Sequence, residues 1–83
     1  MVSVDILYFA ATRDLAGTDQ ERRELPAELD DVALRAVLTA AHPRLAGLLP
    51  ACRFAVDEEI VPPGAMRLRD GACLALIPPV SGG

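Results

Sequence analysis

The sequence predicts an α+β domain in which a small mixed β-sheet is covered on one face by one main helix. The most apolar strand-like segments lie near the two ends of the chain, at residues 2–9 and 74–77, and a helical pattern lies between them at residues 31–42. The most apolar strands of a sheet belong at its centre, so we expect the first and last strands to be neighbours. Running in the same direction, they would form a parallel pair inside an otherwise antiparallel sheet.

The first part of the chain predicts a hairpin whose connection contains a helical turn. Residues 2–6 alternate between apolar and other side chains, which is typical of a strand with one face toward the core. Residues 10–15 follow as a short helical turn that ends at Gly17, a residue suited to a left-handed C-cap. Residues 20–25 predict a second, polar strand at an edge of the sheet, where its charges discourage pairing with other chains.

The main helix is predicted to begin at an N-cap aspartate, Asp30 or Asp31, and to end near His42. Its apolar side chains recur at the spacing of one helix face. They are Leu34, Val37, Leu38 and Ala41. On this pattern Arg35 and Thr39 point away from the core, and His42 is expected to be a solvated residue at the helix end.

The second half predicts a further helical turn and then short strands. Residues 44–50 continue the helical cover, and residues 52–56 and 59–61 predict a third and a fourth strand. Asp70-Gly71 is a strong turn signal before the last strand, residues 74–77. We expect that strand to be buried on both faces, because its apolar run is continuous. This order, with a parallel central pair, describes a β-grasp, ubiquitin-like sheet of four to five strands.

The end of the chain predicts an extended arm. Pro78 and Pro79 lack a backbone N–H and cannot continue a sheet ladder, so the chain must leave the sheet after the last strand. Gly82-Gly83 then carries no side chain that a narrow channel would reject. We therefore expect a β-grasp domain at residues 1–78 and an extended C-terminal tail at residues 79–83 that presents a carboxylate away from the body.

Four stretches of the sequence resemble the small subunits of molybdopterin synthase, a family of ubiquitin-like sulfur carriers. The ending is highly specific, and together the four span nearly the whole chain in the family's order. They are Ile77–Gly83, Tyr8–Arg13, Ala55–Glu59 and Leu68–Gly71. The sequence departs from the family at Asp57, where Asn is frequent, and at Ala72, where an acidic residue commonly stands. Both positions are expected at turns or strand edges, so the departures bear little on function.

The resemblance implies that Gly83 carries the reacting group. In this family an ATP-dependent, E1-like activating enzyme adenylates the C-terminal carboxylate, and a persulfide sulfur donor replaces AMP to give a thiocarboxylate. The thiocarboxylate donates sulfur to cyclic pyranopterin monophosphate in molybdenum cofactor biosynthesis. The large subunit supplies the catalytic base and the substrate pocket, in a heterotetramer of two small and two large subunits. The small subunit is not catalytic alone, and no cofactor of its own is implied.

The resemblance also implies two surfaces for the large subunit. The end of the chain enters a channel of the partner, and an exposed apolar patch with a polar border docks beside the root of the arm. The channel residues are Gly82, Ser81, Val80 and Pro79. The patch residues are Phe9, Leu68, Ile77 and Val80, with Arg13 at the rim.

Charge and residue content exclude several other classes of function. Twelve acidic residues against eight basic ones leave a net charge of −4, whereas a nucleic-acid partner needs a basic face. No segment suits a membrane span or a signal peptide, so a cytoplasmic location is expected. The one histidine has no plausible nucleophile partner, and Cys52 and Cys73 match no zinc or redox spacing. We expect both cysteines to be small buried hydrophobes.

Three alternatives share the same chain ending. A ubiquitin-like protein modifier would join Gly83 to lysines of target proteins, although this sequence contains no lysine through which copies could be linked to each other. A sulfur carrier of thiamine synthesis also ends in Gly-Gly, but the approach through Pro78–Ser81 favours the molybdopterin branch. A plain interaction domain would tolerate an extra residue after Gly83, which a carrier would not.

Overall fold

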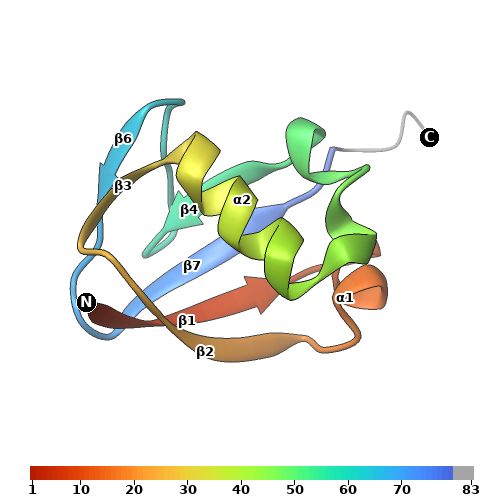
Figure 1. The fold of residues 1–83 in the computed structure, drawn as a ribbon, viewed down its shortest axis with the longest axis horizontal. Coiled ribbons are helices and arrows are strands. Elements are labelled where there is room, and N and C mark those ends of the chain that lie inside the picture. Colours follow the sequence, from red (N-terminus) through yellow and green to blue (C-terminus); the bar gives the residue numbers. More distant parts are fainter. Residues whose placement is uncertain (80–83) are drawn as a thin grey trace.

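The main sheet is built around its first and last strands. A computed structural model describes residues 1–79 (Figure 1). The strand order is β2-β1-β7-β4-β5. β1 and β7 lie side by side and run in the same direction (Figure 1), with parallel pairing from Val4 opposite Ala72 to Tyr8 opposite Leu76. The predicted parallel central pair is confirmed, and the mixed sheet has five strands, within the expected four to five. The strands are β1 Val2–Tyr8, β2 Gln20–Leu25, β4 Arg53–Val56, β5 Glu59–Ile60 and β7 Ala72–Ile77.

One helix, α2, covers one face of this sheet (Figure 1). It spans Asp31–Ala41, and the Asp30 side chain caps it by accepting a hydrogen bond of 2.7 Å from the Ala33 N–H. Leu34 and Leu38, two members of the predicted stripe, are fully buried against the sheet. The core therefore lies between α2 and the inward side chains of β1 and β7. Its largest fully buried members are Tyr8, Ile6, Leu25, Leu34, Leu38, Leu45, Leu49, Leu68, Leu74 and Leu76.

Short elements complete the fold. The predicted helical turn is α1, Ala11–Ala16, and the cover after α2 consists of two 3-10 turns, η1 at Pro43–Leu45 and η2 at Leu49–Ala51. A second sheet was not predicted: β3, Glu28–Asp30, pairs antiparallel with β6, Ala65–Arg67. Three residues are too few for an alternating pattern to stand out in a sequence. None of the helices in the described part is long and apolar enough to cross a membrane.

The expectation that the last strand is buried on both faces is wrong. Leu74 and Leu76 are fully buried toward α2, whereas Cys73, Ala75 and Ile77 on the other side of β7 are only half-buried. A continuous apolar run indicates a central strand, but it does not require a second layer of helices. The sheet face away from α2 is therefore left open, and we call it the open face.

Arg35 does not point away from the core as predicted. Its Nε donates to the Leu49 carbonyl at 3.2 Å, its Nη2 donates to the Cys52 carbonyl at 3.1 Å, and its Nη1 pairs with Asp31 at 2.6 Å. The guanidinium also lies 4.8 Å from the centre of the Phe54 ring, a cation–π distance. One side chain thus joins α2 to η2 and to the start of β4.

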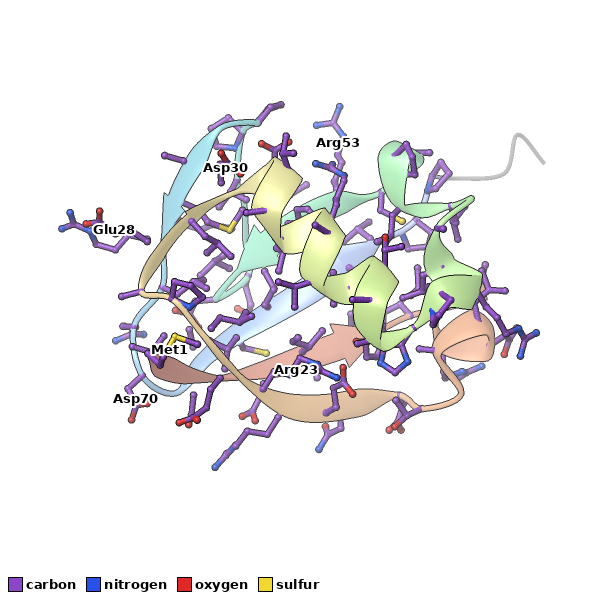
Figure 2. All side chains as sticks on the ribbon, viewed as in Figure 1. Met1, Arg23, Glu28, Asp30, Arg53 and Asp70 are labelled. Atoms are coloured by element: carbon purple, nitrogen blue, oxygen red, sulfur yellow. The ribbon has the colours of Figure 1, made fainter. Side chains whose placement is uncertain are left out.

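His42 is not a solvated end residue either. Its Nε2 lies 3.0 Å from Glu21 Oε1, and its ring packs edge-on against Tyr8 at 5.5 Å. The same oxygen accepts hydrogen bonds from the Tyr8 hydroxyl at 2.6 Å and from Arg23 Nε at 3.1 Å. Arg23 extends from β2 beneath α2 (Figure 2). This cluster, Tyr8, Glu21, Arg23 and His42, ties the C-terminal end of α2 to the β1–β2 hairpin.

The cluster shifts the pKa of its carboxyl group. Burial alone raises the pKa of Glu21, but hydrogen bonds from Tyr8, His42 and Arg23 outweigh it and hold the pKa below the ordinary 4.5. Burial, followed by the hydrogen bond to Glu21, raises the pKa of Tyr8. A depressed carboxyl pKa stabilises the folded state above the unfolded-state pKa, and this contribution is lost as the pH falls through the folded-state value.

Glu21→Gln tests this cluster. The substitution removes the charge that three donors share, so we expect the free energy of unfolding at pH 7 to fall by about 1–2 kcal/mol. The variant should also lose less stability than the native chain as the pH falls below about 4.5, because the group that titrates there is gone. Urea unfolding at neutral and acidic pH measures both effects. Glu24→Gln, an exposed position on the same strand, is the matched control, and equal losses from the two variants would contradict the assignment.

Candidate functional site

The chain leaves the main sheet at the end of its central strand, β7. Leu76 lies opposite Tyr8 of β1, and Ile77 lies opposite Arg53 of β4, so the last strand has neighbours on both sides up to its end. Pro78 is half-buried and Pro79 is exposed immediately after it. The root of the arm is thus fixed by two strands. The other predicted tail positions, Val80, Ser81, Gly82 and Gly83, lie outside the described residues.

Phe9 lies beside this root. It follows Tyr8 at the end of β1, so the parallel register brings it to the same end of the sheet as Ile77. Its exposed fraction is 49%, in a chain whose other two aromatic side chains, Tyr8 and Phe54, are buried. The expected exposure of Phe9 is confirmed, and its part in docking stays a prediction. Arg13, on α1, is exposed as predicted for a rim residue.

Leu68 does not belong to the patch. It is only 2% exposed and lies in the hydrophobic core, and its N–H donates to the Ala27 carbonyl at 2.6 Å. It also precedes the turn that leads into β7, whereas Ile77 ends that strand, so the two residues lie at opposite ends of it. The predicted surface position of Leu68 is therefore wrong. The cause is the unpredicted β3–β6 pairing, which places the segment that follows β6 against the core.

Ile60 is an apolar surface residue that the sequence analysis missed. It is 55% exposed on β5 and lies opposite Ala55, which in turn lies opposite Ala75 of β7. Directly paired residues share a face of a sheet, so Ile60 and Ile77 both belong to the open face. The available signal was the short strand at residues 59–61, but a two-residue strand does not reveal which side chain points inward. We define the apolar patch as Phe9, Ile60 and Ile77.

A second arginine lies close to the root of the arm. Arg53 is exposed and stands directly opposite Ile77. Directly paired residues share a face of a sheet, so its side chain belongs to the open face with Ile77. Arg53 and Arg13, which lies on α1 just after β1, are both exposed cations at this end of the sheet. Such a border favours an acidic partner surface.

The body holds no evident catalytic machinery among residues 1–79. No group of three His, Cys, Asp or Glu there could hold a metal ion. Burial raises the pKa of Cys52, and burial together with nearby carboxylates raises the pKa of Cys73, so both thiols stay protonated near neutral pH. The geometry therefore suits a rigid body that aims an arm and offers one apolar surface beside it.

Known proteins of the same kind cover this chain from end to end. Residues 6–83 match the model of the ThiS family. The chain belongs to the ThiS family. The molybdopterin synthase sulfur carrier subunit of Chlamydomonas reinhardtii is 39% identical over 83 residues, covering 99% of this chain and 100% of the relative. The protein of the same description from Caenorhabditis briggsae is 38% identical over 84 residues and covers both chains fully, at 100% each.

Solved structures agree with the predicted β-grasp fold, which is confirmed. A putative molybdopterin converting factor, subunit 1, from Pyrococcus furiosus has a TM-score of 0.81 and 28% identity, covering 96% of this chain and 100% of that one. SAMP1 from Haloferax volcanii has a TM-score of 0.77 and 27% identity, with coverages of 98% and 99%. The complex of subunits 1 and 2 of the molybdopterin-converting factor from Helicobacter pylori contains a chain with a TM-score of 0.74 and 24% identity, with coverages of 99% and 100%. That last likeness is one of fold alone.

Leu68→Ala and Ile60→Ala form a matched pair that tests these placements. Removing the buried Leu68 side chain leaves a cavity, so the free energy of unfolding should fall by about 2–4 kcal/mol. Removing the exposed Ile60 side chain should cost less than about 1 kcal/mol. Urea denaturation of both variants measures the difference. If Ile60→Ala proved the more destabilising of the two, the assignment of the open face would be wrong.

Proposed function

We propose that this chain is a sulfur carrier that serves as the small subunit of molybdopterin synthase. The observation that carries the proposal is the full-length similarity to carriers of that description, which extends through the Gly82-Gly83 ending. The β-grasp body at residues 1–78 positions the arm, and the tail at residues 79–83 carries the reacting group. The reaction takes place in the cytoplasm.

The chemistry begins with activation of the Gly83 carboxylate. A carboxylate is a poor electrophile, so an E1-like enzyme transfers AMP from ATP to it and releases pyrophosphate. A persulfide sulfur then attacks the acyl carbon and displaces AMP, which gives an acyl disulfide. A thiol cleaves its S–S bond, so the thiol donor is oxidised to a disulfide and the chain is left with a thiocarboxylate.

The arm that carries the thiocarboxylate then delivers sulfur to a pterin. The proposed partner is the large subunit of molybdopterin synthase, which supplies the base and the pocket for cyclic pyranopterin monophosphate. A chain of the same fold is present in the Helicobacter pylori complex of subunits 1 and 2, which makes such a pairing sterically reasonable. Two sulfur atoms enter each product molecule, so two carriers loaded with sulfur are consumed. A heterotetramer of two small and two large subunits is consistent with this ratio.

Docking of the body aims the arm. In our proposal the apolar patch of Phe9, Ile60 and Ile77 contacts the large subunit, and Arg13 contributes to the rim. The tail residues Pro79 to Gly82 occupy the partner's channel. An apolar centre with a charged border is typical of stable interfaces.

A protein modifier is the second candidate, because SAMP1 and the small archaeal modifier protein 1 of Haloferax volcanii share the fold. In that role the activated Gly83 would form an isopeptide bond with lysines of other proteins. Covalent adducts of a tagged chain in a cell extract would support the modifier. Their absence, together with sulfur loading of Gly83, would favour the carrier.

Extending the chain by one residue after Gly83 tests the chemistry. The authentic carboxylate is then blocked as an amide, so incubation with ATP, the activating enzyme and a persulfide donor should no longer exchange oxygen for sulfur at residue 83. Intact mass spectrometry reads this exchange directly. Circular dichroism should show an unchanged body, because the change lies beyond the sheet. Full synthase activity from the extended chain would contradict the mechanism.

Phe9→Ala tests the docking surface. About half of the surface of Phe9 is exposed, and burying that roughly 100 Å² in a partner is worth about 2 kcal/mol. Affinity for the cognate large subunit should therefore fall roughly 30-fold, while the thermal stability of the isolated chain changes little. Isothermal titration calorimetry and thermal unfolding measure the two quantities. Val32→Ala, at a 71% exposed apolar position on α2, is the control and should bind normally.

A further inference from the structure

The segment that presents Phe9 is a strained turn. The Thr12 N–H donates to the Phe9 carbonyl at 3.0 Å, which closes a four-residue turn from the end of β1 into α1. Ala10 has φ 50° and ψ −123°. These angles are close to the first central position of a type II′ turn, roughly +60° and −120°, where glycine is the preferred residue. Ala10 thus holds a backbone conformation that its β-carbon disfavours.

One side chain reinforces this turn with two further hydrogen bonds. The Thr12 hydroxyl accepts a hydrogen bond from the Phe9 N–H at 2.9 Å and donates one to the Phe9 carbonyl at 2.7 Å. Both backbone polar groups of Phe9 are therefore bound to the same residue. Thr12 is fully buried.

The position of the Phe9 ring depends on the strained turn at Ala10 and on the hydrogen bonds of Thr12. Strained backbone persists only where its surroundings over-determine it. Backbone bonds from the Thr12 N–H to the Phe9 carbonyl and from the Arg13 and Asp14 N–H groups to the Ala10 carbonyl contribute here, and the Thr12 hydroxyl adds two more bonds to Phe9. Without the two hydroxyl bonds, Ala10 would relax toward negative φ, and the peptide groups on both sides of Phe9 would turn. The ring would then leave its place beside Ile77 at the root of the arm.

We propose that Thr12 is a positioning residue, which fixes the Phe9 ring for docking on the large subunit by holding Ala10 in its strained turn. This inference rests on the proposed function, because docking is the event that needs the ring in place. Thr12 is buried and cannot contact a partner itself. Its effect must therefore pass through the backbone of Phe9, and this distinguishes it from a residue of the interface.

Two single substitutions separate the hydroxyl from the bulk of Thr12. Thr12→Val keeps the shape and removes both side-chain hydrogen bonds. We expect affinity for the cognate large subunit, per folded molecule, to fall roughly tenfold, and exchange of the Phe9 amide hydrogen to become at least roughly tenfold faster. Thr12→Ser keeps the hydroxyl and should stay within roughly threefold of the native chain in both measurements. A loss in Thr12→Ser as large as in Thr12→Val would overturn the proposal in favour of simple packing.

The decisive measurement is rescue by glycine at Ala10. Glycine adopts the turn conformation without strain, so the turn no longer needs the hydroxyl to hold it. Ala10→Gly alone should bind within roughly threefold of the native chain and be no less stable. Combined with Thr12→Val, it should restore affinity to within roughly threefold, a large non-additivity between two neighbouring sites. A double variant as weak as Thr12→Val alone would overturn the proposal.

The same variants distinguish a failure to fold, and a failure of the proposed function, from a failure of the role of Thr12. If Thr12→Val does not fold but the double variant does, the rescue is seen in folding itself and supports the proposal; if neither folds, Thr12 is a core residue and the proposal fails. Phe9→Ala tests the function separately. Normal binding by Phe9→Ala would refute the docking surface, whereas weak binding by Phe9→Ala with normal binding by Thr12→Val would refute only the role of Thr12.

Discussion

Parallel pairing of the first and last strands is the constraint on which the arrangement of the site depends. Because β1 and β7 run in the same direction, they end at the same edge of the sheet, and the residue after β1 lies beside the residue that ends β7. An antiparallel pair would have placed the start of β1 there instead. The root of the arm therefore has Phe9 on one side and, through the antiparallel β4, Arg53 on the other.

The two faces of the sheet serve different purposes. Toward α2, two polar attachments hold the helix: the cluster around Glu21 at its C-terminal end and the bonds of Arg35 near its beginning. Both join segments far apart in the sequence, so they fix the helix against the sheet in one orientation. The open face has no such layer. Its central strand carries the small residues Cys73 and Ala75, which leave the larger Ile60 and Ile77 accessible to a partner.

Patterns that repeat over several residues made the fold predictable from the sequence. The limits of α2, the hairpin with its Gly17 cap and the central parallel pair all follow from periodicity and from turn residues. What failed depends on a single side chain and a distant partner. Arg35 bonds to residues 14 and 17 positions away, and His42 bonds to one 21 positions away, distances over which no local pattern operates. Leu68 was misplaced because its direction follows from the three-residue strand pair β3–β6, and Ile60 was missed for the same reason at β5.

An activated carrier must also avoid reacting with itself, and the body is suited to this. In the proposed reaction the acyl adenylate at Gly83 is open to attack by any amine or thiolate within reach. The sequence contains no lysine, so no side-chain amine competes. The two thiols are the remaining candidates among side chains, and burial raises the pKa of both, with added repulsion from Asp5, Asp57 and Glu58 at Cys73. A protonated thiol is a poor nucleophile, so neither Cys52 nor Cys73 competes with the persulfide of the donor for the activated carbon.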